Sequence, residues 1–296
     1  MEYDVTDVEY LRHGTTPLLA RLYIPRGKGT FRCVVEVHGG VWTLNDRTHT
    51  EPVHIALAQA GIAVAALDFR QGAEGAYPLS VADVHYGIRW TKANAHLLKS
   101  RSDLVGICSQ SSGAHIAALL AIRPHDSRYG ATHMAAGLPE VDATFRCLAM
   151  FWPVVNPVGR YRYAKYLLTQ PNAPDWAIRH IPLHDAYWKT EENMREGSPL
   201  FALEQGEGNA LPPALWLQPR VDPQHIYEDP ASPVSGTDLE KFIAAYRRTG
   251  ASIEIEYYDA PQYFTTVDPR SGASKSAFAR VVGFFQRHIP DPALRE

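Results

Sequence analysis

Short apolar runs alternate along the chain with segments in which apolar residues recur at helical spacing. The runs that predict strands are 18–24, 31–38, 62–70, 104–108, 146–152, 214–218 and 253–258. The segments that predict helices are 52–60, 79–98, 113–122, 238–248 and 274–288. Alternating strands and helices are typical of an α/β protein, so the pattern predicts a mostly parallel central sheet flanked by helices.

The alternation stops between residues 154 and 203. Residues 153–233 hold 12 of the 22 prolines, and residues 152–216 hold four of the six tryptophans. Because proline interrupts helices and central strands, this region is not another strand–helix repeat. We predict a core formed by 1–153 and 204–296, with 154–203 inserted as a helical cap over the carboxyl edge of the sheet, where open α/β sheets bind ligands.

Composition and charge exclude several classes of protein. The 296 residues carry 29 Lys and Arg against 32 Asp and Glu, and a net charge of −3 gives no electrostatic reason to expect nucleic acid or an anionic membrane as a partner. The polar, acidic start does not resemble a signal peptide. Cys33, Cys108 and Cys147 are an odd number in apolar runs, which predicts reduced, buried thiols and a cytoplasmic location.

The segment 104–117 carries the most specific chemical signal. A predicted strand runs into Ser109-Gln-Ser-Ser-Gly113 and then directly into a helix rich in small residues. This strand–turn–helix context is that of a nucleophile elbow, in which a sharp turn exposes the central serine. Ser111 is therefore the candidate nucleophile, and the backbone amide of Ser112 is a candidate donor to an oxyanion.

A second signal, His38-Gly-Gly-Val-Trp42, ends the second predicted strand about 70 residues upstream. Glycines allow the backbone to approach a reacting carbonyl group and to point amides at it. The candidate oxyanion residues are therefore Gly39, Gly40, Val41 and Ser112.

Taken together, these motifs resemble the α/β-hydrolases of the hormone-sensitive-lipase-like esterase group, which borders on the arylformamidases. The resemblance covers roughly residues 18–288 and includes LDFRQGAEGAYPLSVADVHYGIRW at 67–90. It implies an α/β-hydrolase fold, a Ser-His-Asp acyl-enzyme mechanism without cofactor or metal, and a small-molecule ester or amide as substrate. A homodimer is an expectation from the resemblance alone.

The resemblance also implies an acid after the next-to-last strand and a histidine after the last one. Asp222, in the segment LWLQPRVDP, matches the acid, but Gln262 occupies the position of the histidine. The only histidines that follow Asp222 are His225, in the acid loop itself, and His288, in the last predicted helix. Glutamine cannot take up a proton near neutral pH, so the sequence predicts a chain without a general base and with very slow turnover.

Three interpretations remain open. The chain is a hydrolase inactivated by a His-to-Gln replacement at position 262, or a natural pseudo-hydrolase that binds a small ligand without turnover. The third is an active hydrolase that recruits another base, such as His225 or a cap histidine, His180 or His184. Ester, amide and formamide substrates are also left open, because the same machinery serves all three.

Aromatic residues near the predicted site suggest an apolar or aromatic substrate of small to medium size. The candidate substrate-binding residues are Trp42, Trp152, Trp188 and Tyr263. The basic and aromatic segment 160–165 is expected to be one face of a cap helix. His180 and His184 are four residues apart, but Pro182 lies between them and no third ligand is evident, so no metal site is expected.

Overall fold

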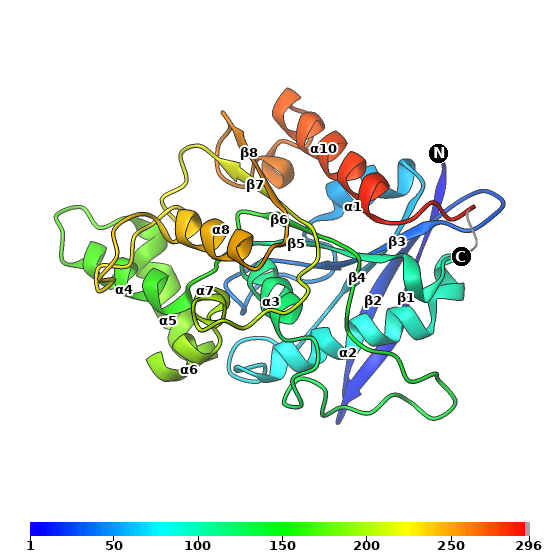
Figure 1. Ribbon diagram of the computed structural model, residues 1–296, viewed down its shortest axis with the longest axis horizontal. Coiled ribbons are helices and arrows are strands. Elements are labelled where there is room, and N and C mark those ends of the chain that lie inside the picture. Colours follow the sequence, from blue (N-terminus) through cyan, green and yellow to red (C-terminus); the bar gives the residue numbers. More distant parts are fainter. Residues whose placement is uncertain (294–296) are drawn as a thin grey trace.

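The computed structural model describes residues 1–293, which form one eight-stranded sheet covered by helices on both faces (Figure 1). The strand order is β1-β2-β4-β3-β5-β6-β7-β8. The strands are β1 (Tyr3–His13), β2 (Thr16–Pro25), β3 (Arg32–Val37), β4 (Ile62–Leu67), β5 (Val105–Gln110), β6 (Leu148–Phe151), β7 (Ala214–Pro219) and β8 (Ile253–Tyr258). Strands β3 to β8 are parallel, whereas β2 is antiparallel to both β1 and β4.

The chain changes direction across the sheet at β3. It continues from β3 to β4 on one side and then returns as β5 on the other side, with Val37 paired to Ser109. The carboxyl ends of β3 and β5 therefore lie next to each other. This is a topological switch point, where α/β sheets place their ligand sites.

Two layers of helices bury the two faces of the sheet. One face packs against α1 (Glu51–Gln59), α9 (Phe264–Val267) and α10 (Gly272–His288), and the other against α2 (Leu79–Ala93), α3 (Ser111–Ile122) and α8 (Asp238–Arg248). Two short 3-10 helices, Ala95–Leu98 and Ser102–Leu104, join α2 to β5. The strands β3, β4 and β5 are buried on both faces, which explains why their sequences are almost continuously apolar.

Four helices lie between β6 and β7 and gather at one end of the molecule (Figure 1). They are α4 (Pro157–Leu168), α5 (Asp175–Trp188), α6 (Glu191–Glu196) and α7 (Pro199–Glu204). Helix α4 packs on α5, while α7 packs on α3 and α8. The helices fall where the cap was expected, at 154–203, but the division of the chain into a cap and a core stays a prediction.

The α/β fold is confirmed, and every predicted strand is present. Strand β1 was not predicted. Most of its residues are exposed, and Tyr10 is the only buried residue in it. Cys33, Cys108 and Cys147 are free and buried, as expected. Within residues 1–293 no helix combines the length and the apolar character that a membrane span requires.

Candidate active site

The nucleophile elbow lies between β5 and α3. Ser111 is the first residue of α3 and has a φ of 49°, a left-handed conformation that is uncommon for a residue with a side chain. A Cβ atom at Gly113 would overlap the carbonyl oxygens of Val37 and His38. Only glycine therefore allows α3 to pack this closely on the end of β3.

The loop after β3 passes over the elbow. A Cβ at Gly39 would lie 3.0 Å from the carbonyl oxygen of Gln110 and 3.1 Å from Cβ of Ser111. The next residue, Gly40, has a φ of 127°, and a side chain there would overlap the backbone of Leu44. The two glycines thus serve two purposes, a close approach to the nucleophile and a tight turn.

The backbone amides of Gly40, Val41 and Ser112 belong to the loop and the elbow that meet at this junction, where the oxyanion site is predicted. The Trp42 amide donates to Oγ of Ser112 at 3.1 Å, which fixes the loop against the elbow, and the amides of Gly40 and Val41 have no partner in residues 1–293. The Ser112 amide lies in the first turn of α3, where helix amides lack an intrahelical acceptor and the helix dipole favours negative charge. The structure brings the predicted oxyanion residues together; their binding of an oxyanion stays a prediction.

A histidine does reach the nucleophile, and it is His225. Its Nε2 lies 3.0 Å from Oγ of Ser111, and its Nδ1 lies 2.8 Å from Oδ2 of Asp222. The expectation that no histidine after Asp222 can serve as a base is therefore wrong. Asp222 and His225 stand three residues apart in the turn after β7, where the His225 and Ile226 amides both donate to the carbonyl oxygen of Asp222. This turn places both side chains on the same side of the loop.

Gln262 occupies the place that the family histidine was expected to fill, against Asp222. Its Nε2 donates to Oδ1 of Asp222 at 2.6 Å, and its Oε1 accepts from Nε2 of Gln224 at 2.8 Å. Gln224 in turn accepts from the Tyr263 hydroxyl at 2.7 Å. Gln262 therefore positions the acid and takes no proton itself.

The surroundings lower the pKa of both His225 and Asp222. Burial lowers the pKa of His225, the Arg160 guanidinium lowers it further, and Asp222 acts in the opposite direction. Burial alone would raise the pKa of Asp222, but His225 and the amide donors outweigh burial and hold that pKa below its usual value. A neutral imidazole that donates from Nδ1 to the carboxylate leaves Nε2 free to accept the serine proton.

Local sequence could have placed His225 beside Asp222, but not beside Ser111. A histidine three residues after an acid, in a turn that opens with Asp-Pro, lies on the same side of the backbone as that acid. Its contact with Ser111, 114 positions away, depends on the sheet order. The other proposed bases lie elsewhere: Nδ1 of His180 contacts Arg160, and His184 packs its ring between Trp42 and Tyr161.

Three of the four candidate substrate-binding aromatics are almost fully buried. Trp42 stacks on Tyr187 with ring centroids 5.2 Å apart, and Trp188 stacks on Tyr77 at 5.0 Å. The third, Trp152, packs against Tyr263, whose hydroxyl belongs to the hydrogen-bond chain behind Asp222. Contact of these four residues with substrate stays a prediction.

Helix α4 also supplies Arg160, a residue that was expected only as part of a helix face. Its side chain is 1% exposed, and its Nη2 lies 3.0 Å from Nδ1 of His180. Burial was not foreseeable, because it depends on how α4 packs against α5. The charge on Arg160 affects the pKa of His225, so the residue lies in the surroundings of the base.

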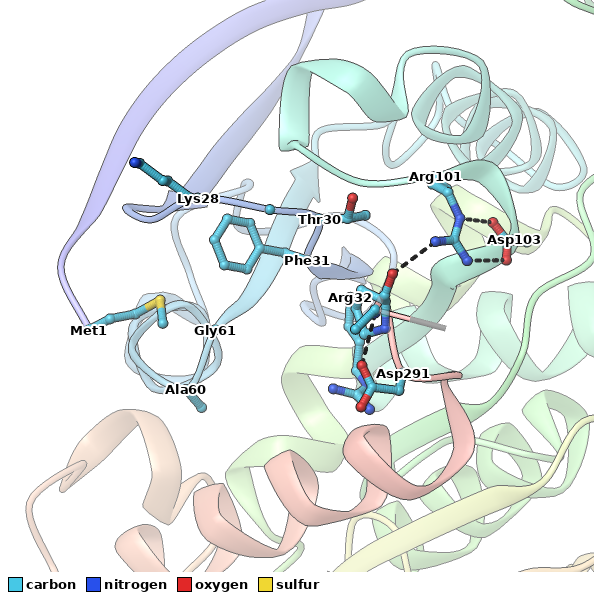
Figure 2. A pocket seen from close by; sticks show the side chains of 13 residues that line it. Met1, Lys28, Thr30, Phe31, Arg32, Ala60, Gly61, Arg101, Asp103 and Asp291 are labelled. Atoms are coloured by element: carbon cyan, nitrogen blue, oxygen red, sulfur yellow. Dashed lines mark hydrogen bonds and ion pairs between the residues drawn. The ribbon is translucent and has the colours of Figure 1, made fainter. Parts of the chain in front are cut away.

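One cavity in the described chain lies away from this site. It measures about 1010 Å³ and is lined by residues near the amino end of β3, among them Arg32, Arg101 and Asp103 (Figure 2). Arg101 pairs with Asp103, and Arg32 donates to the carbonyl oxygen of Ile289. Ser111, by contrast, lies at the carboxyl end of β5 and is buried, so this groove is not the site of the serine chemistry.

Comparisons with known proteins find similarity to proteins named as esterases. The BD-FAE family model matches residues 21–147. The esterase LipQ of Mycobacterium tuberculosis is 21% identical over 85% of this chain and 54% of its own length. A probable isoprenylcysteine alpha-carbonyl methylesterase of Oryza sativa subsp. japonica is 25% identical over 93% of this chain and 61% of its own length. The chain therefore spans little more than half the length of these curated relatives.

Solved structures support the fold. A hyperthermophilic esterase from Pyrobaculum calidifontis superimposes with a TM-score of 0.72 and 21% identity, over 96% of this chain and 83% of that one. Esterase LipW from Mycobacterium marinum gives a TM-score of 0.73 and 20% identity, over 98% and 83% of the two chains. With this sheet order, a serine at a sharp turn at the switch point and these structural matches, the chain has the α/β-hydrolase fold.

Proposed function

We propose that this chain is a carboxylic ester hydrolase in which Ser111 is the nucleophile, His225 the general base and Asp222 the acid that orients the base. The observation that carries the proposal is the 3.0 Å contact between Oγ of Ser111 and Nε2 of His225, whose other nitrogen faces Asp222. A nucleophile, a base and an orienting group in hydrogen-bond contact form the arrangement that activates a serine. The esterase names of the relatives favour esters over amides.

The chemistry proceeds in two acyl-transfer steps. Oγ of Ser111 attacks the ester carbonyl carbon while its proton passes to Nε2 of His225, and the amides of Gly40, Val41 and Ser112 stabilise the oxyanion. The C–O bond then breaks, and the alcohol leaves with the proton from His225. A water molecule then attacks the acyl carbon and gives its proton to Nε2 of His225. The bond between Oγ of Ser111 and the acyl carbon breaks, His225 returns the proton to Oγ, and the carboxylic acid leaves.

With His225 in place, the reason to expect an inactive chain disappears. Gln262 donates to Asp222, which His225 also contacts, so replacement of a catalytic histidine at position 262 is not needed to explain the glutamine. A receptor that only binds its ligand would not need a base aligned on the nucleophile. We therefore favour an active hydrolase with a displaced base over an inactivated enzyme and over a pseudo-hydrolase.

The test is hydrolysis of 4-nitrophenyl butyrate by the native chain and by the variants Ser111→Ala, His225→Ala and Gln262→His. We expect activity in the native chain and a loss of about 10⁴- to 10⁶-fold in kcat for Ser111→Ala and His225→Ala, because each removes one member of a unit that works together. Gln262→His should give no gain, because it disturbs the support of Asp222.

The matched control is His288→Ala, which removes the other histidine downstream of Asp222. His288 lies on α10 and packs against Phe284, so its loss should leave kcat within about twofold. The proposal is overturned if His225→Ala retains most of the native activity, or if Gln262→His raises kcat by two orders of magnitude. A native chain that hydrolyses 4-nitroanilides but no esters would point to an amidase instead.

A further inference from the structure

Arg160 is a buried cation without an anionic partner in the described chain. The side chain lies on α4 and is 1% exposed. Its Nη2 contacts Nδ1 of a histidine, His180, at 3.0 Å, whereas Nε and Nη1 have no hydrogen-bond partner within residues 1–293. Arginine is almost never buried unless it is paired, so these donors require an explanation.

The carboxylates around Arg160 are engaged with other groups. Asp222 contacts His225, Asp229 lies 3.6 Å from Arg162, and Asp238 accepts from Asn156 at 2.9 Å. Each of these acids therefore already has its own donor or cation. The described chain supplies no carboxylate within ion-pair distance of the Arg160 guanidinium.

The guanidinium lies close to the proposed site. The Val154 amide donates to the carbonyl oxygen of Ser111 at 3.3 Å. Helix α4, which carries Arg160, begins shortly after it, at Pro157. Burial is the larger cause of the lowered pKa of His225, and the Arg160 charge contributes to it. The same guanidinium is also close enough to lower the pKa of His184.

His184 lies near Arg160, whose charge adds to burial in lowering the pKa of His184. It also contacts Trp42 in the loop after β3. The His184 ring is fully buried and meets the Trp42 ring edge-on at 5.0 Å, and its Nδ1 also lacks a partner within residues 1–293. The Trp42 amide in turn donates to Ser112. Arg160 on α4 and His184 on α5 thus both carry buried nitrogens without a partner within residues 1–293, and the Arg160 charge acts on both His184 and His225.

We propose that Arg160 binds a carboxylate of the substrate, so that the enzyme acts on esters that carry a free carboxylate, such as monoesters of dicarboxylic acids. The proposal rests on the ester hydrolysis proposed above and names the substrate class of that site. A carboxylate would accept charge-assisted hydrogen bonds from the Nε and Nη1 donors and neutralise the buried charge. The cation would then discriminate strongly against neutral esters, because these would leave it buried and unpaired.

The experiment compares two substrates that share a scissile bond, mono(4-nitrophenyl) glutarate and its methyl ester. We expect the native chain to hydrolyse the acid with the higher kcat/KM. Arg160→Met should lower kcat/KM for the acid on the order of 10²-fold more than for the methyl ester, mainly through KM, because removal of one partner breaks a buried charge pair. Arg160→Lys keeps the charge and should retain part of the preference.

A second pair, 4-acetoxybenzoic acid and its methyl ester, places the carboxylate on the alcohol portion. A preference for the acid in either pair, lost in Arg160→Met, supports the proposal and shows which side of the ester the cation faces. The matched control is Arg162→Met, two residues along α4, because Arg162 pairs with Glu191 at 2.7 Å. This variant should leave the preference unchanged.

The outcomes separate this proposal from the proposed function. If the native chain hydrolyses neither these four esters nor 4-nitrophenyl butyrate, the proposed ester hydrolysis fails, whereas hydrolysis of the butyrate alone overturns only the assignment of Arg160. If it hydrolyses the methyl esters as well as the acids, the function stands and the assignment of Arg160 is overturned. Equal losses for acid and methyl ester in Arg160→Met would also overturn it, because they indicate a structural role. The native chain alone can contradict the proposal, so the test does not require that Arg160→Met folds.

Discussion

Asp222 is held by more hydrogen bonds than any other member of the proposed triad. Its carboxylate accepts from Gln218 and Gln262 side chains and from the Gln224 amide, in addition to His225. These bonds fix the carboxylate, and the carboxylate fixes the tautomer and the orientation of the His225 ring. Gln262, at the position where the resemblance implied the base, instead donates a hydrogen bond to Asp222.

The protonation of His225 predicts the pH dependence of the reaction. The base works only when it is neutral, and burial lowers its pKa below the usual value of about 6.5. The value of kcat/KM for 4-nitrophenyl butyrate should therefore rise with pH on an acid limb below pH 6.5 and be level at neutral pH. Initial rates between pH 4 and 8 measure this limb.

Arg160→Met provides the control for this profile. Loss of the positive charge removes one of the causes that lower the pKa of His225, so the acid limb should move to higher pH. Arg162→Met should not move it. If the acid limb of the kcat/KM profile of the native chain is centred above pH 7, the buried His225 is not the base.

At the scale of elements, the base and the acid both come from the turn that follows β7. The resemblance had placed the base after β8, where Gln262 instead contacts Asp222. The two loops therefore meet at one carboxylate, and either one could in principle present an imidazole to it.

This arrangement predicts a partial rescue. His225→Gln should lose the activity, and addition of Gln262→His should recover on the order of 10- to 100-fold in kcat, because the new imidazole would contact the same acid as in the family pattern. The test is to measure kcat for His225→Gln, Gln262→His and the double variant, which form a double-mutant cycle with the native chain. A double variant no more active than His225→Gln alone would show that position 262 cannot reach the nucleophile.

The sequence was sufficient for the parts of the site that depend on local backbone. Ser111 and the glycines at 39, 40 and 113 belong to turns whose geometry requires small residues, so their roles could be predicted from spacing. His225 could not be assigned in the same way, because its partner Ser111 lies 114 positions away and meets it only through the order of the strands. The edge strand β1 was missed for a related reason, since it buries only one residue and carries little apolar signal.

At the scale of the whole molecule, aromatic packing joins the helices between β6 and β7 to the sheet domain. Trp188 of α5 is fully buried, and its ring lies 5.3 Å from the rings of Trp42 and His115 and 5.0 Å from that of Tyr77. These partners come from the loop after β3, from α3 and from the segment before α2. A single side chain thus links the cap region to three parts of the core.

Replacement of Trp188 should therefore weaken the fold. Trp188→Ala is expected to lower the free energy of unfolding by about 3–5 kcal/mol, because it removes a large buried ring and leaves a cavity. Tyr166→Ala on α4, where the tyrosine is 50% exposed, is the control and should change it by less than about 0.5 kcal/mol. Urea unfolding measures both, and equal small effects would contradict a role of Trp188 in joining the two regions.

The single turn that carries Asp222 and His225 has a consequence for how the enzyme can diverge. When acid and base stand on different loops, every insertion or shift between those loops threatens their alignment. Here the pair is encoded within four consecutive residues, from Asp222 to His225, and its internal geometry depends on local backbone hydrogen bonds. In the proposed triad the loop after β8 need not supply the proton-transferring group, so a change of residue at position 262 does not by itself remove the base.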